Sequence, residues 1–422
     1  MRKLYFLYST FEEFPNDRVD LTELFSSGIA DRGHRIDWHM HPAEISDGGV
    51  RQVGVNERVF LCAKKPSSSV RARWENSLSR LGHTLSLIGL IKQNPYDFVQ
   101  VRDQILGALI AVIGCALARR PFVFWMSFRY VEADLFKARD NTLGLSLAKR
   151  IMLFIRGYVS AQVLYRVILP RAHHIFVQSD RMEDDLAERG VARSKMTPVP
   201  MGVKWSKIGG SEVAPADEAW LQDRLVIVYV GTLVKARRLD FLVEVLDFVR
   251  VECPTVLLVL VGDGSISDMS FIERVIETRG VQDYVHFTGH VQMEKAWSLI
   301  KAAKLGLSPL RPSPMLDAGS PTKVMEYLAL GCPVVANDQP DQSKVVRESG
   351  AGLIVPYDVR RFADAVVTLL KSPADAERMG QLGPDYVRRH RSYEAMTPLL
   401  EAKYLELFGC PEGAPRPDGS IG

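Results

Sequence analysis

Short apolar segments alternate with longer amphipathic ones along most of the chain, and this rhythm predicts alternating strands and helices. In the first half the predicted strands, rich in Val, Ile and Phe, are Lys3–Ser9, Ile36–Met40, Val59–Cys62, Phe98–Val101, Phe122–Met126 and His174–Ser179. Helix-length segments lie between them, at Leu21–Arg32, Trp74–Lys92 and Ile105–Leu117. Because these strands are apolar on both faces and are joined by helices, they indicate a parallel sheet covered on both sides.

The second half repeats the alternation. Its predicted strands are Val226–Val230, Val256–Val261, Val285–Thr288, Leu305–Ser308, Pro333–Ala336 and Leu353–Val355. Its predicted helices are Leu239–Arg250, Ile272–Arg279, Lys295–Ala302, Lys323–Leu330 and Arg361–Leu370. Two such sets predict an α/β protein with two tandem Rossmann-like, doubly wound domains, and its ligand site is expected in a central cleft that both domains face.

The apolar rhythm breaks at Gly209, Gly210 and Pro215, which indicates a linker between the domains. A chain of 422 residues is also too long for one ordinary domain. The expected organisation is an N-terminal domain over 1–204, a linker over 205–222, a C-terminal domain over 223–392, a helix over 393–410 that can cross back to the first domain, and a disordered tail over 411–422.

Composition narrows the class of protein. Hydrophobic residues make up 47% and charged residues 24%, which excludes a disordered, collagen-like or coiled-coil chain. The net charge of +3 gives no support to nucleic-acid wrapping, so no nucleic acid is expected as a partner. The five cysteines form no CxxC pair, which disfavours a disulfide framework or a cysteine zinc site and favours a reducing cytoplasm.

The segment from Ser320 to Ala336 carries the most chemical information. Ser320 is predicted to be the N-cap of a helix, with Pro321 at the first helical position and Gly331 after the last. Lys323 then lies in the first turn, where a cation opposes the helix dipole at a cost of about 0.3 to 1 kcal/mol. A bound anion would reverse this effect, because it gains from the free backbone N–H groups and from the ammonium.

Glu326 follows one turn after Lys323. Its carboxylate can accept two hydrogen bonds from a vicinal diol, such as that of a ribose. A solvated ion pair between Lys323 and Glu326, at (i, i+3) spacing, explains the same residues without any ligand.

A basic loop is expected after the first strand of the second domain, where Lys235, Arg237 and Arg238 follow Gly231. Arg side chains suit phosphate oxygens, and a solvated loop is the alternative. The turn Gly262-Asp263-Gly264 lacks the full G-x-G-x-x-G fingerprint, so it gives little support to hydride transfer.

These segments, together with Val285–Val291 and Gly350–Pro356, resemble the nucleotide-binding domain of family-four, retaining glycosyltransferases of the GT-B fold, of the bacterial polysaccharide type. The resemblance implies a sugar-nucleotide donor, which is a substrate, and no cofactor. The resemblance implies Glu326 at the ribose, and Thr322, Lys323 and Arg237 at the diphosphate. The helix terminus at Ser320 is a further candidate at the diphosphate, and Gly231, Gly262, His290 and Asp317 are candidates near the base or the sugar. For His290, an ordinary loop histidine is the alternative.

The sequence also departs from the family pattern. Ala318 occupies the first position of a glutamate pair that the family often carries, with Asp317 beside it. The first domain has no evident histidine in the loop Trp125–Glu132, where the family usually places one. These departures keep open a catalytically inactive GT-B binding module, and a sugar-nucleotide epimerase of the same fold is a second alternative.

The implied reaction requires a nucleoside diphosphate to leave an anomeric carbon, and cations at the phosphates would stabilise it. No DxD-like acidic pair stands at a predicted strand end, so we expect no metal site and a metal-independent reaction. The candidates for handling the acceptor hydroxyl, and hence the catalytic candidates, are Asp103, Arg129 and Glu132, which follow predicted strands. Ordinary charges of surface loops are the alternative for all three.

The segment Lys149–Leu169 combines long aliphatic stretches with four basic residues. An amphipathic basic helix of this kind can lie on an anionic membrane surface, and a packed helix between the domains is the alternative. No segment is expected to reach the roughly 18 to 20 apolar residues that span a bilayer. The sequence therefore favours a cytoplasmic hexosyltransferase, peripheral on the inner face of the membrane, that uses a glycan or lipid-linked acceptor in cell-surface polysaccharide synthesis.

Overall fold

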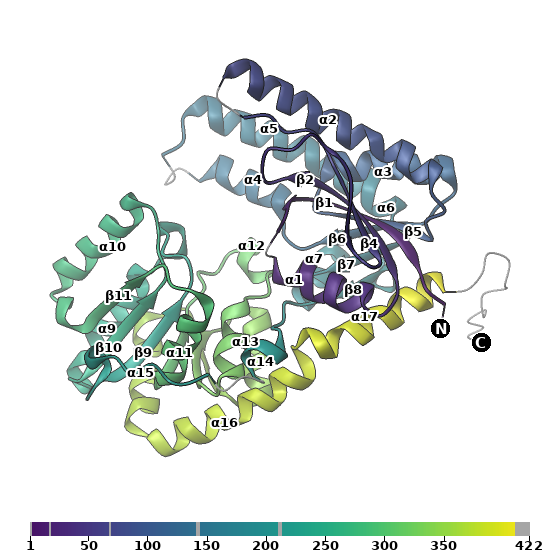
Figure 1. The fold of residues 1–422 in the computed structure, drawn as a ribbon. Helices are drawn as coiled ribbons and strands as arrows, with labels where there is room; N and C mark the ends of the chain where they lie inside the picture. Colours follow the sequence, from purple (N-terminus) through teal and green to yellow (C-terminus); the bar gives the residue numbers. More distant parts are fainter. Residues whose placement is uncertain (1, 17, 67–68, 141–143, 210–212, 410–422) are drawn as a thin grey trace. The chain divides into compact units, whose positions relative to one another are not determined.

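The computed structural model describes residues 2–16, 18–66, 69–140, 144–209 and 213–409 (Figure 1). Its chain divides into two compact units. The first holds the chain up to Val199 and again from Met396, and the second runs from Pro200 to Ala395. Each unit is built on one sheet with helices on both faces, which confirms the predicted α/β class.

The first sheet has eight strands in the order β3-β4-β2-β1-β5-β6-β7-β8. All neighbours are parallel except β3, which pairs antiparallel with β4. The strands are β1 (Tyr5–Phe14), β2 (Arg35–Pro42), β3 (Gly49–Gly54), β4 (Glu57–Leu61), β5 (Phe98–Arg102), β6 (Phe122–Met126), β7 (His174–Val177) and β8 (Met196–Pro198). The sequence pattern missed β3, because this edge strand is exposed along nearly its whole length and lacks the apolar character of the inner strands.

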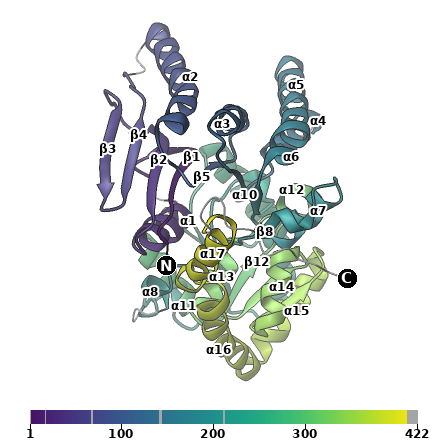
Figure 2. The same cartoon turned by 90° about the vertical axis from the view of Figure 1, so that its right-hand side faces the viewer.

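Helices cover both faces of the first sheet (Figures 1 and 2). They are α1 (Val19–Leu21), the π-helical η1 (Thr22–Ala30), α2 (Val70–Gln93), α3 (Ile105–Ala118), α4 (Tyr130–Arg139), α5 (Leu147–Val163), the π-helical η3 (Leu164–Ile168), α6 (Leu169–Arg171), α7 (Asp180–Ala187) and the short 3-10 turn η4 (Arg193–Lys195). On one face lie α2, α3 and the continuous helix from α5 to α6, whereas α1, η1 and the end of the last helix lie on the other.

The second sheet has six parallel strands in the order β11-β10-β9-β12-β13-β14, a doubly wound arrangement. They are β9 (Leu225–Val230), β10 (Val256–Val261), β11 (Val285–Gly289), β12 (Leu305–Ser308), β13 (Val334–Asn337) and β14 (Gly352–Val355). The α-helices are α8 (Trp205–Ile208), α9 (Asp240–Glu252), α10 (Ile266–Arg279), α11 (Met293–Ala302), α12 (Pro314–Asp317), α13 (Thr322–Ala329), α14 (Pro340–Ser349), α15 (Val359–Lys371) and α16 (Pro373–His390). Three 3-10 turns complete the unit: η5 (Ala219–Leu221), η6 (Lys235–Arg237) and η7 (Gln282–Tyr284).

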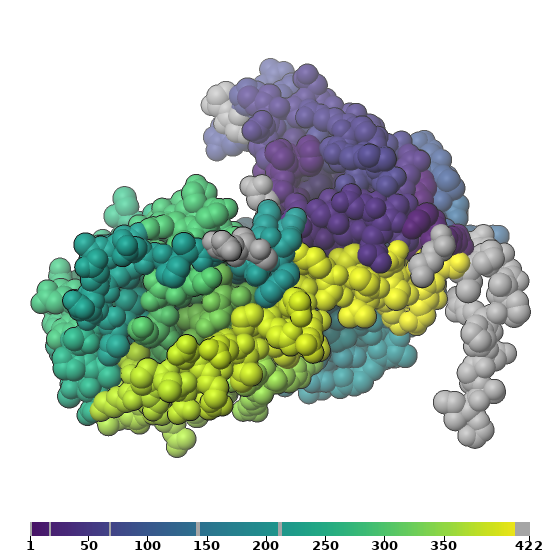
Figure 3. Space-filling model, turned by 60° about the horizontal axis from the view of Figure 1, so that its bottom comes forward, coloured from purple at the N-terminus to yellow at the C-terminus, as the bar shows by residue number. Residues whose placement is uncertain are grey.

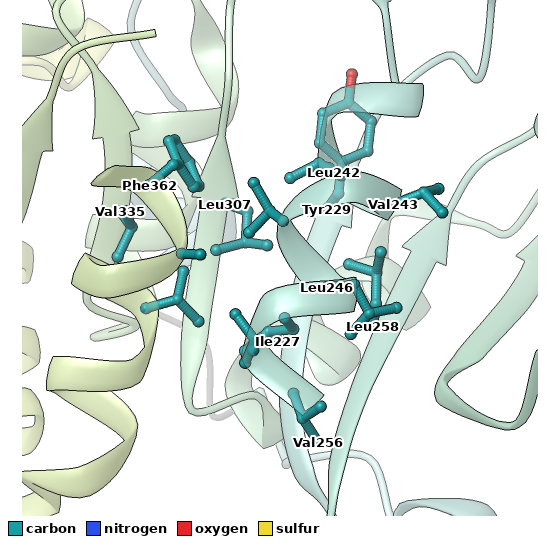
Figure 4. Close-up of a cluster of buried hydrophobic side chains, with 14 of the residues drawn as sticks. Ile227, Tyr229, Leu242, Val243, Leu246, Val256, Leu258, Leu307, Val335 and Phe362 are labelled. Atoms are coloured by element: carbon teal, nitrogen blue, oxygen red, sulfur yellow. The ribbon is translucent and has the colours of Figure 1, made fainter. Parts of the chain in front are cut away.

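The core of the second unit lies on both faces of this sheet. Ile227 and Tyr229 of β9 belong to a buried cluster with α9, α10 and α15, and Figure 4 shows part of it. Val226 and Val228 alternate with them and pack on the opposite face with α11 and α13. Strand β9 is therefore apolar on both faces, which is why its sequence reads as a continuous hydrophobic run.

The segment expected to be a linker is part of the second unit. Trp205 in α8 and Trp220 and Leu221 in η5 pack against the cluster that contains Val226. The interpretation of 205–222 as a linker is therefore wrong for its described residues, because Trp205 and Trp220, which flank the Gly and Pro signals in the sequence, are anchored on this cluster. The expected tail over 411–422 lies outside the described residues.

The last helix, α17 (Tyr393–Phe408), carries the chain back to the first unit. The rings of Tyr404 and Phe408 stack on Phe98 of β5, at centroid distances of 5.0 Å and 4.4 Å. Figure 3 shows the yellow C-terminal helix lying against the purple N-terminal part of the chain. The last helix that the structure describes thus completes the core of the unit that begins with β1.

Candidate functional site

The first turn of α13 has no side-chain cap. The helix begins at Thr322 with Pro321 as the N-cap residue, so the prediction of Ser320 as the cap is wrong. The Ser320 hydroxyl donates a hydrogen bond to Asp341 (2.7 Å) and accepts one from the backbone N–H of Met201 (3.0 Å). Because Ser320 is engaged elsewhere, the positive end of the helix dipole is not neutralised by a capping side chain.

Tyr327 fixes the position of α13 against the sheet. Its hydroxyl accepts a hydrogen bond from the N–H of Val230 (2.9 Å) and donates one to the carbonyl of Leu307 (3.3 Å). Its ring needs the space over Gly306, where an added Cβ would lie 2.5 Å from the ring. The first turn of α13 is thereby held beside the carboxyl end of β9.

Lys323 is a buried cation whose Nζ has no hydrogen-bonding partner in the described part of the chain. Its side chain is 7% exposed, and its Nζ lies 4.0 Å from the centroid of the Tyr229 ring. Burial lowers the pKa of Lys323, while the Tyr229 hydroxyl and Glu326 act in the opposite direction. Burying an ammonium group without a counterion costs roughly several kcal/mol of free energy. We therefore expect Lys323 to bind an anionic ligand.

Tyr229 supplies a second unpartnered polar atom beside Lys323. Its ring packs into the apolar cluster under the sheet edge, and Figure 4 shows its hydroxyl pointing away from the aliphatic side chains. This hydroxyl is fully buried and has no hydrogen-bond partner within the described ranges. Burial alone would raise the pKa of Tyr229, but the charges of Lys323 and Arg237 outweigh burial and lower it. The sequence analysis missed Tyr229, because a tyrosine within an apolar strand resembles any core aromatic.

The structure distinguishes among the three cations of the basic loop. Lys235 lies over the ring of Phe271 (4.9 Å), and Arg238 forms an ion pair with Asp240 (2.7 Å). Arg237 is exposed and forms no ion pair with any residue that the structure describes. Of the three, Arg237 is therefore the cation that can turn to a phosphate.

Two glycines keep this edge of the sheet open. Gly231 has a φ of +144°, and a Cβ added there would lie 3.6 Å from the Tyr229 hydroxyl and 3.8 Å from Lys323 Nζ. Gly262 has a φ of +134°, and a Cβ added there would lie only 2.2 Å from the carbonyl oxygen of Gly231. The loops after β9 and β10 thus approach each other as closely as glycine allows, and both unpartnered polar atoms lie beside Gly231.

Glu326 is half-buried on the next turn of α13. Burial raises its pKa to about 7, while Lys323 acts to lower it. No ion pair joins Glu326 to Lys323 in the described part of the chain, so the alternative of a simple solvated pair does not hold. Both side chains keep their hydrogen-bonding capacity for another molecule.

The remaining predicted residues of this unit lie around the same edge of the sheet. Thr322 is the first residue of α13 and is half-buried. Asp317 ends α12, where its carboxylate accepts a weak hydrogen bond from the N–H of Ser313 (3.4 Å). His290 is exposed directly after β11, and Ala318 is fully buried.

The first unit places Asp103 at the carboxyl end of β5 in a left-handed conformation, with a φ of +58°. Its carboxylate accepts hydrogen bonds from the N–H of Ser127 (2.8 Å), from the Ser127 hydroxyl and from the N–H of Phe128 (3.4 Å). Burial raises the pKa of Asp103 against the pull of Arg102. Asp103 is therefore a buried group that shapes the loop after β6, and not a solvated loop charge.

Arg129 and Glu132 belong to a largely buried ionic network. Arg129 donates to Asp185 of α7 (2.6 Å) and to Glu132 (3.3 Å). Glu132 also accepts from Tyr165 and from Arg189 (2.7 Å). Both predicted catalytic candidates are thus engaged with the protein itself, and they connect α4 with α7 and η3. The interpretation of these groups as ordinary surface charges is therefore wrong.

Three aromatic rings, missed by the sequence analysis, lie near the carboxyl ends of β1 and β6: Phe11 within the last part of β1, Phe128 after β6, and Tyr130 at the start of α4. Phe11 and Tyr130 meet edge to face at 5.4 Å, and Phe128 contacts Tyr130 at 4.9 Å. Phe11 and Tyr130 are 36% and 40% exposed. Partly exposed aromatic rings at the ligand-binding edge of a parallel sheet provide flat apolar surfaces of the kind that line binding sites.

Within the described ranges, no group of three or more His, Cys, Asp and Glu side chains is placed to hold a metal ion. The pattern of unpartnered atoms instead fits an organic anion in the second unit. Lys323, Tyr229, Arg237 and the open helix end together provide hydrogen-bond donors without an acceptor.

Comparison with known proteins gives two matches to protein-family models. The model described as "Glycosyl transferase 4-like domain" matches residues 22–202, and the model described as "Glycosyl transferases group 1" matches residues 224–372. Each match falls on one of the two sheets. Together the two matches include both edges described above.

The chain is also similar to individual transferases. It is 27% identical to an alpha-D-kanosaminyltransferase of Streptomyces kanamyceticus over 44% of this chain and 47% of that protein. It is 30% identical to a GDP-mannose-dependent alpha-(1-6)-phosphatidylinositol monomannoside mannosyltransferase of Mycolicibacterium smegmatis, over 39% of this chain and 43% of that protein. The matches thus span about half the length of these curated relatives or less.

Solved structures share the fold of the whole chain. Sucrose-phosphate synthase from Thermosynechococcus elongatus has a TM-score of 0.71 at 19% identity, covering 97% of this chain and all of the other. The Anabaena protein HepE, solved with UDP, has a TM-score of 0.64 at 13% identity, covering 95% of this chain and 99% of the other.

Proposed function

Since the chain carries the two α/β domains of a GT-B glycosyltransferase, we propose that it transfers a hexose-type sugar from a nucleoside-diphosphate donor to a glycan or lipid-linked acceptor in cell-surface polysaccharide synthesis. The observation that carries the proposal is a pair of buried polar atoms beside Gly231, Lys323 Nζ and the Tyr229 hydroxyl, to which no described residue gives a hydrogen bond. Both groups donate hydrogen bonds, and both lie next to the uncapped end of α13.

The diphosphate of the donor is the ligand that fits this arrangement. Its oxygens would be bound by the ammonium of Lys323, the hydroxyl of Tyr229 and the N–H groups of the first turn of α13. Arg237, in the loop after β9, would add a further contact to the phosphates. Thr322 and Ser320 flank this position, although the Ser320 hydroxyl is already bound to Asp341. The Glu326 carboxylate would accept hydrogen bonds from the two ribose hydroxyl groups. The residues that would border the base or the sugar are Gly231, Gly262, His290 and Asp317.

These groups would also act on the reaction itself. In the transfer, the bond between the anomeric carbon and the phosphate oxygen breaks, and its electron pair stays on the diphosphate. The acceptor oxygen forms the new bond and loses its proton. Cations and helix N–H groups held in place before the reaction stabilise the charge that builds on the leaving group. Retention of the anomeric configuration and independence of metal ions belong to this proposal.

The acceptor would bind at the carboxyl edge of the first sheet. Phe11 and Tyr130 present exposed ring faces there, and sugars pack on such faces through their C–H groups. Asp103, Arg129 and Glu132 would act as positioning residues for the loop that bears Phe128 and Tyr130, since their polar atoms are bound within the protein. This assignment replaces direct catalysis by these three residues. A cytoplasmic enzyme, peripheral on the inner face of the membrane, would fit such an acceptor.

Replacement of Lys323 by Ala tests the proposed donor site. We expect affinity for a nucleoside diphosphate, measured by calorimetry, to fall about 10- to 100-fold, because a charged hydrogen bond is lost. We also expect the thermal unfolding temperature to stay the same or rise, because an unpaired buried cation is removed. Lys301→Ala, at an exposed position of α11, is the matched control.

A panel of sugar nucleotides then tests the reaction. Release of nucleoside diphosphate by the wild type, lost in Lys323→Ala, is the expected result. A sugar-nucleotide isomer without diphosphate release would instead identify an epimerase. Binding without either product across the panel would identify an inactive binding module, and unchanged nucleotide affinity in Lys323→Ala would contradict the phosphate role.

A further inference from the structure

Helix α2 carries an exposed apolar stripe that the described chain leaves uncovered. Trp74, Leu78, Leu81 and Leu85 are 67%, 62%, 44% and 51% exposed. Their spacing of four, three and four residues places them within roughly 60° of one another around the helix. The contact of α2 with the rest of the unit uses other positions, Thr84, Leu87 and Ile91, so the stripe has no packing role.

Helix α5 carries a second stripe of the same kind. Leu147, Ile151, Ile155 and Tyr158 are all more than half exposed, and they lie roughly opposite the buried Leu153 and Gly157. The buried side packs tightly, since a Cβ added at Gly157 would lie 2.9 Å from Leu135 of α4. The apolar side of α5 is therefore its outer side, and a shallow hollow there is lined by Ala148, Ile151, Met152, Ile155 and Arg156.

Each stripe lies in the N-terminal part of a helix that is much longer than the strand that follows it, and for α5 this is the 25-residue helix Leu147–Arg171 before the 4-residue strand β7. Helix α2 has 24 residues, and the strand β5 that follows it has only 5. These lengths correspond to about 36 Å and about 17 Å. Since the helix runs antiparallel to the strand, its N-terminal half extends beyond the strand end. Figure 2 shows α2 and α5 rising on the same side of the sheet, with α3 between them.

The charges on these two helices have one dominant sign. Helix α2 holds four Lys and Arg residues and α5 holds three, whereas Glu75 is the one acidic residue in the two helices. Glu13 and Asp134 pair with Arg80 and Arg156, but Arg73 and Lys149 are exposed and form no ion pair with a described residue. A second copy of the chain on this face would bring like charges together, whereas an anionic surface would complement them.

We propose that the exposed stripes of α2 and α5 dock together on an anionic lipid surface. The apolar side chains would enter the boundary between headgroups and acyl chains, and the basic residues would meet the lipid phosphates. The role of this docking rests on the proposed function. It would bring a lipid-linked acceptor to Phe11 and Tyr130, at the edge of the sheet that the stripes adjoin. The lipid contact thus involves two helices and not the segment Lys149–Leu169 alone.

The helix that contains α5 lies on the membrane in this proposal and does not cross it. The span Leu147–Arg171 is long and apolar enough to cross a bilayer by length and composition, which corrects the expectation that no segment has these properties. Its second half, however, is packed inside the unit, where Leu164, Ile168 and Leu169 are at most 1% exposed. Arg150 and Arg156 also bind Ala138 and Asp134 of α4.

Vesicle sedimentation with the full chain tests this proposal. The probes are vesicles of phosphatidylcholine alone and of phosphatidylcholine mixed with phosphatidylglycerol. We expect binding to the anionic vesicles only, reduced about tenfold by Leu78→Glu with Leu81→Glu in α2, and equally by Ile151→Glu with Ile155→Glu in α5. The control is Val251→Glu with Ile266→Glu, which changes two exposed apolar residues of the second unit and is expected to leave binding unchanged.

Three outcomes would overturn the proposal. Loss of binding in the α5 variant alone would exclude the part assigned to α2. Equal binding of wild type and both variants would exclude the lipid surface, and a dimer that these substitutions dissociate, seen by light scattering, would assign the face to a second copy. Nucleotide affinity of the same variants separates this result from the proposed function, because the donor site lies in the other unit and should be unaffected.

Discussion

At the scale of single residues, the side chains of Tyr229 and Lys323 form one buried cation–aromatic pair. The tyrosine ring lies under the ammonium at 4.0 Å, and neither polar atom has a hydrogen-bonding partner among the residues that the structure describes. A cation over an aromatic face is stabilised by roughly 0.5 to 2 kcal/mol, which offsets only part of the cost of burying it. A diphosphate bound to both groups would account for the remainder.

The variant Tyr229→Phe separates the hydroxyl from the ring. We expect affinity for a nucleoside diphosphate to fall about 3- to 10-fold, since one hydrogen bond is lost while the ring stays under Lys323. Tyr8 in the first unit offers a matched control, because its hydroxyl is also buried and without a partner. Tyr8→Phe makes the same chemical change and should leave the affinity unaltered; a similar loss in both variants would remove the assigned role of Tyr229.

Glu326 should make donor binding depend on pH. Its pKa of about 7 means that a large fraction of the carboxyl is neutral below pH 7, and only the carboxylate can accept from both ribose hydroxyl groups. Affinity for a sugar nucleotide should therefore be about tenfold weaker at pH 6 than at full ionisation. Calorimetry from pH 6 to pH 8 measures this, and Glu326→Gln should bind weakly with a flat profile.

The same shift has an opposite consequence for stability. The folded pKa of Glu326 lies above the usual value for a free glutamate, so folding favours the protonated form. Glu326 therefore destabilises the fold increasingly as the pH rises from the unfolded pKa toward 7. Glu326→Gln should raise the unfolding temperature more at pH 8 than at pH 5. An equal effect at both pH values would show that Glu326 is not neutral in the free protein.

At the scale of elements, the sequence predicted those parts that depend on local pattern. The inner strands of both sheets are apolar on both faces, and their periodicity alone indicates them. Two features that the sequence analysis predicted incorrectly, the missed strand β3 and the absent cap by Ser320, depend instead on their surroundings in the folded chain. Ser320 has the residue type and the following proline of an N-cap, but Asp341, held by Arg391 (2.6 Å), takes its hydroxyl. A distant ion pair has therefore outweighed a local helix signal.

In the candidate site, too, the sequence predicted what depends on local pattern and missed what depends on distant contacts. Glu326, Lys323 and Arg237 could be selected from the sequence, because motif spacing places them at one edge of a sheet. The buried state of Arg129 and Glu132 could not, since their partners Asp185 and Arg189 lie more than fifty residues further along the chain. Whether a charged side chain is buried depends on such long-range ion pairs, and the local sequence pattern contains no information about them.

At the scale of the whole molecule, the first unit is completed only by the end of the chain. Glu401 of α17 is 6% exposed and accepts hydrogen bonds from His34 (2.9 Å) and Arg32. On the other ring nitrogen, His34 accepts from the N–H of Leu4 (3.0 Å), so one network joins residues near both chain ends. Burial alone would raise the pKa of Glu401, yet His34 and Arg32 together lower it.

This network predicts a stability effect confined to the first unit. Glu401→Ala should lower the free energy of unfolding of that unit by about 1 to 3 kcal/mol, because a buried hydrogen bond to His34 and a part-buried one to Arg32 are lost. Since the folded pKa of Glu401 is lowered, the wild-type advantage should hold above the unfolded pKa and shrink as the pH falls through the folded one. Thermal unfolding at pH 7 and pH 4 measures this change. Glu406→Ala, on the exposed side of the same helix, serves as the control, and nucleotide affinity should stay unchanged in both variants. Equal stability of the two variants would show that the Glu401 network does not stabilise the unit, and would leave the anchoring of α17 to its other contacts, such as those of Tyr404 and Phe408 with Phe98.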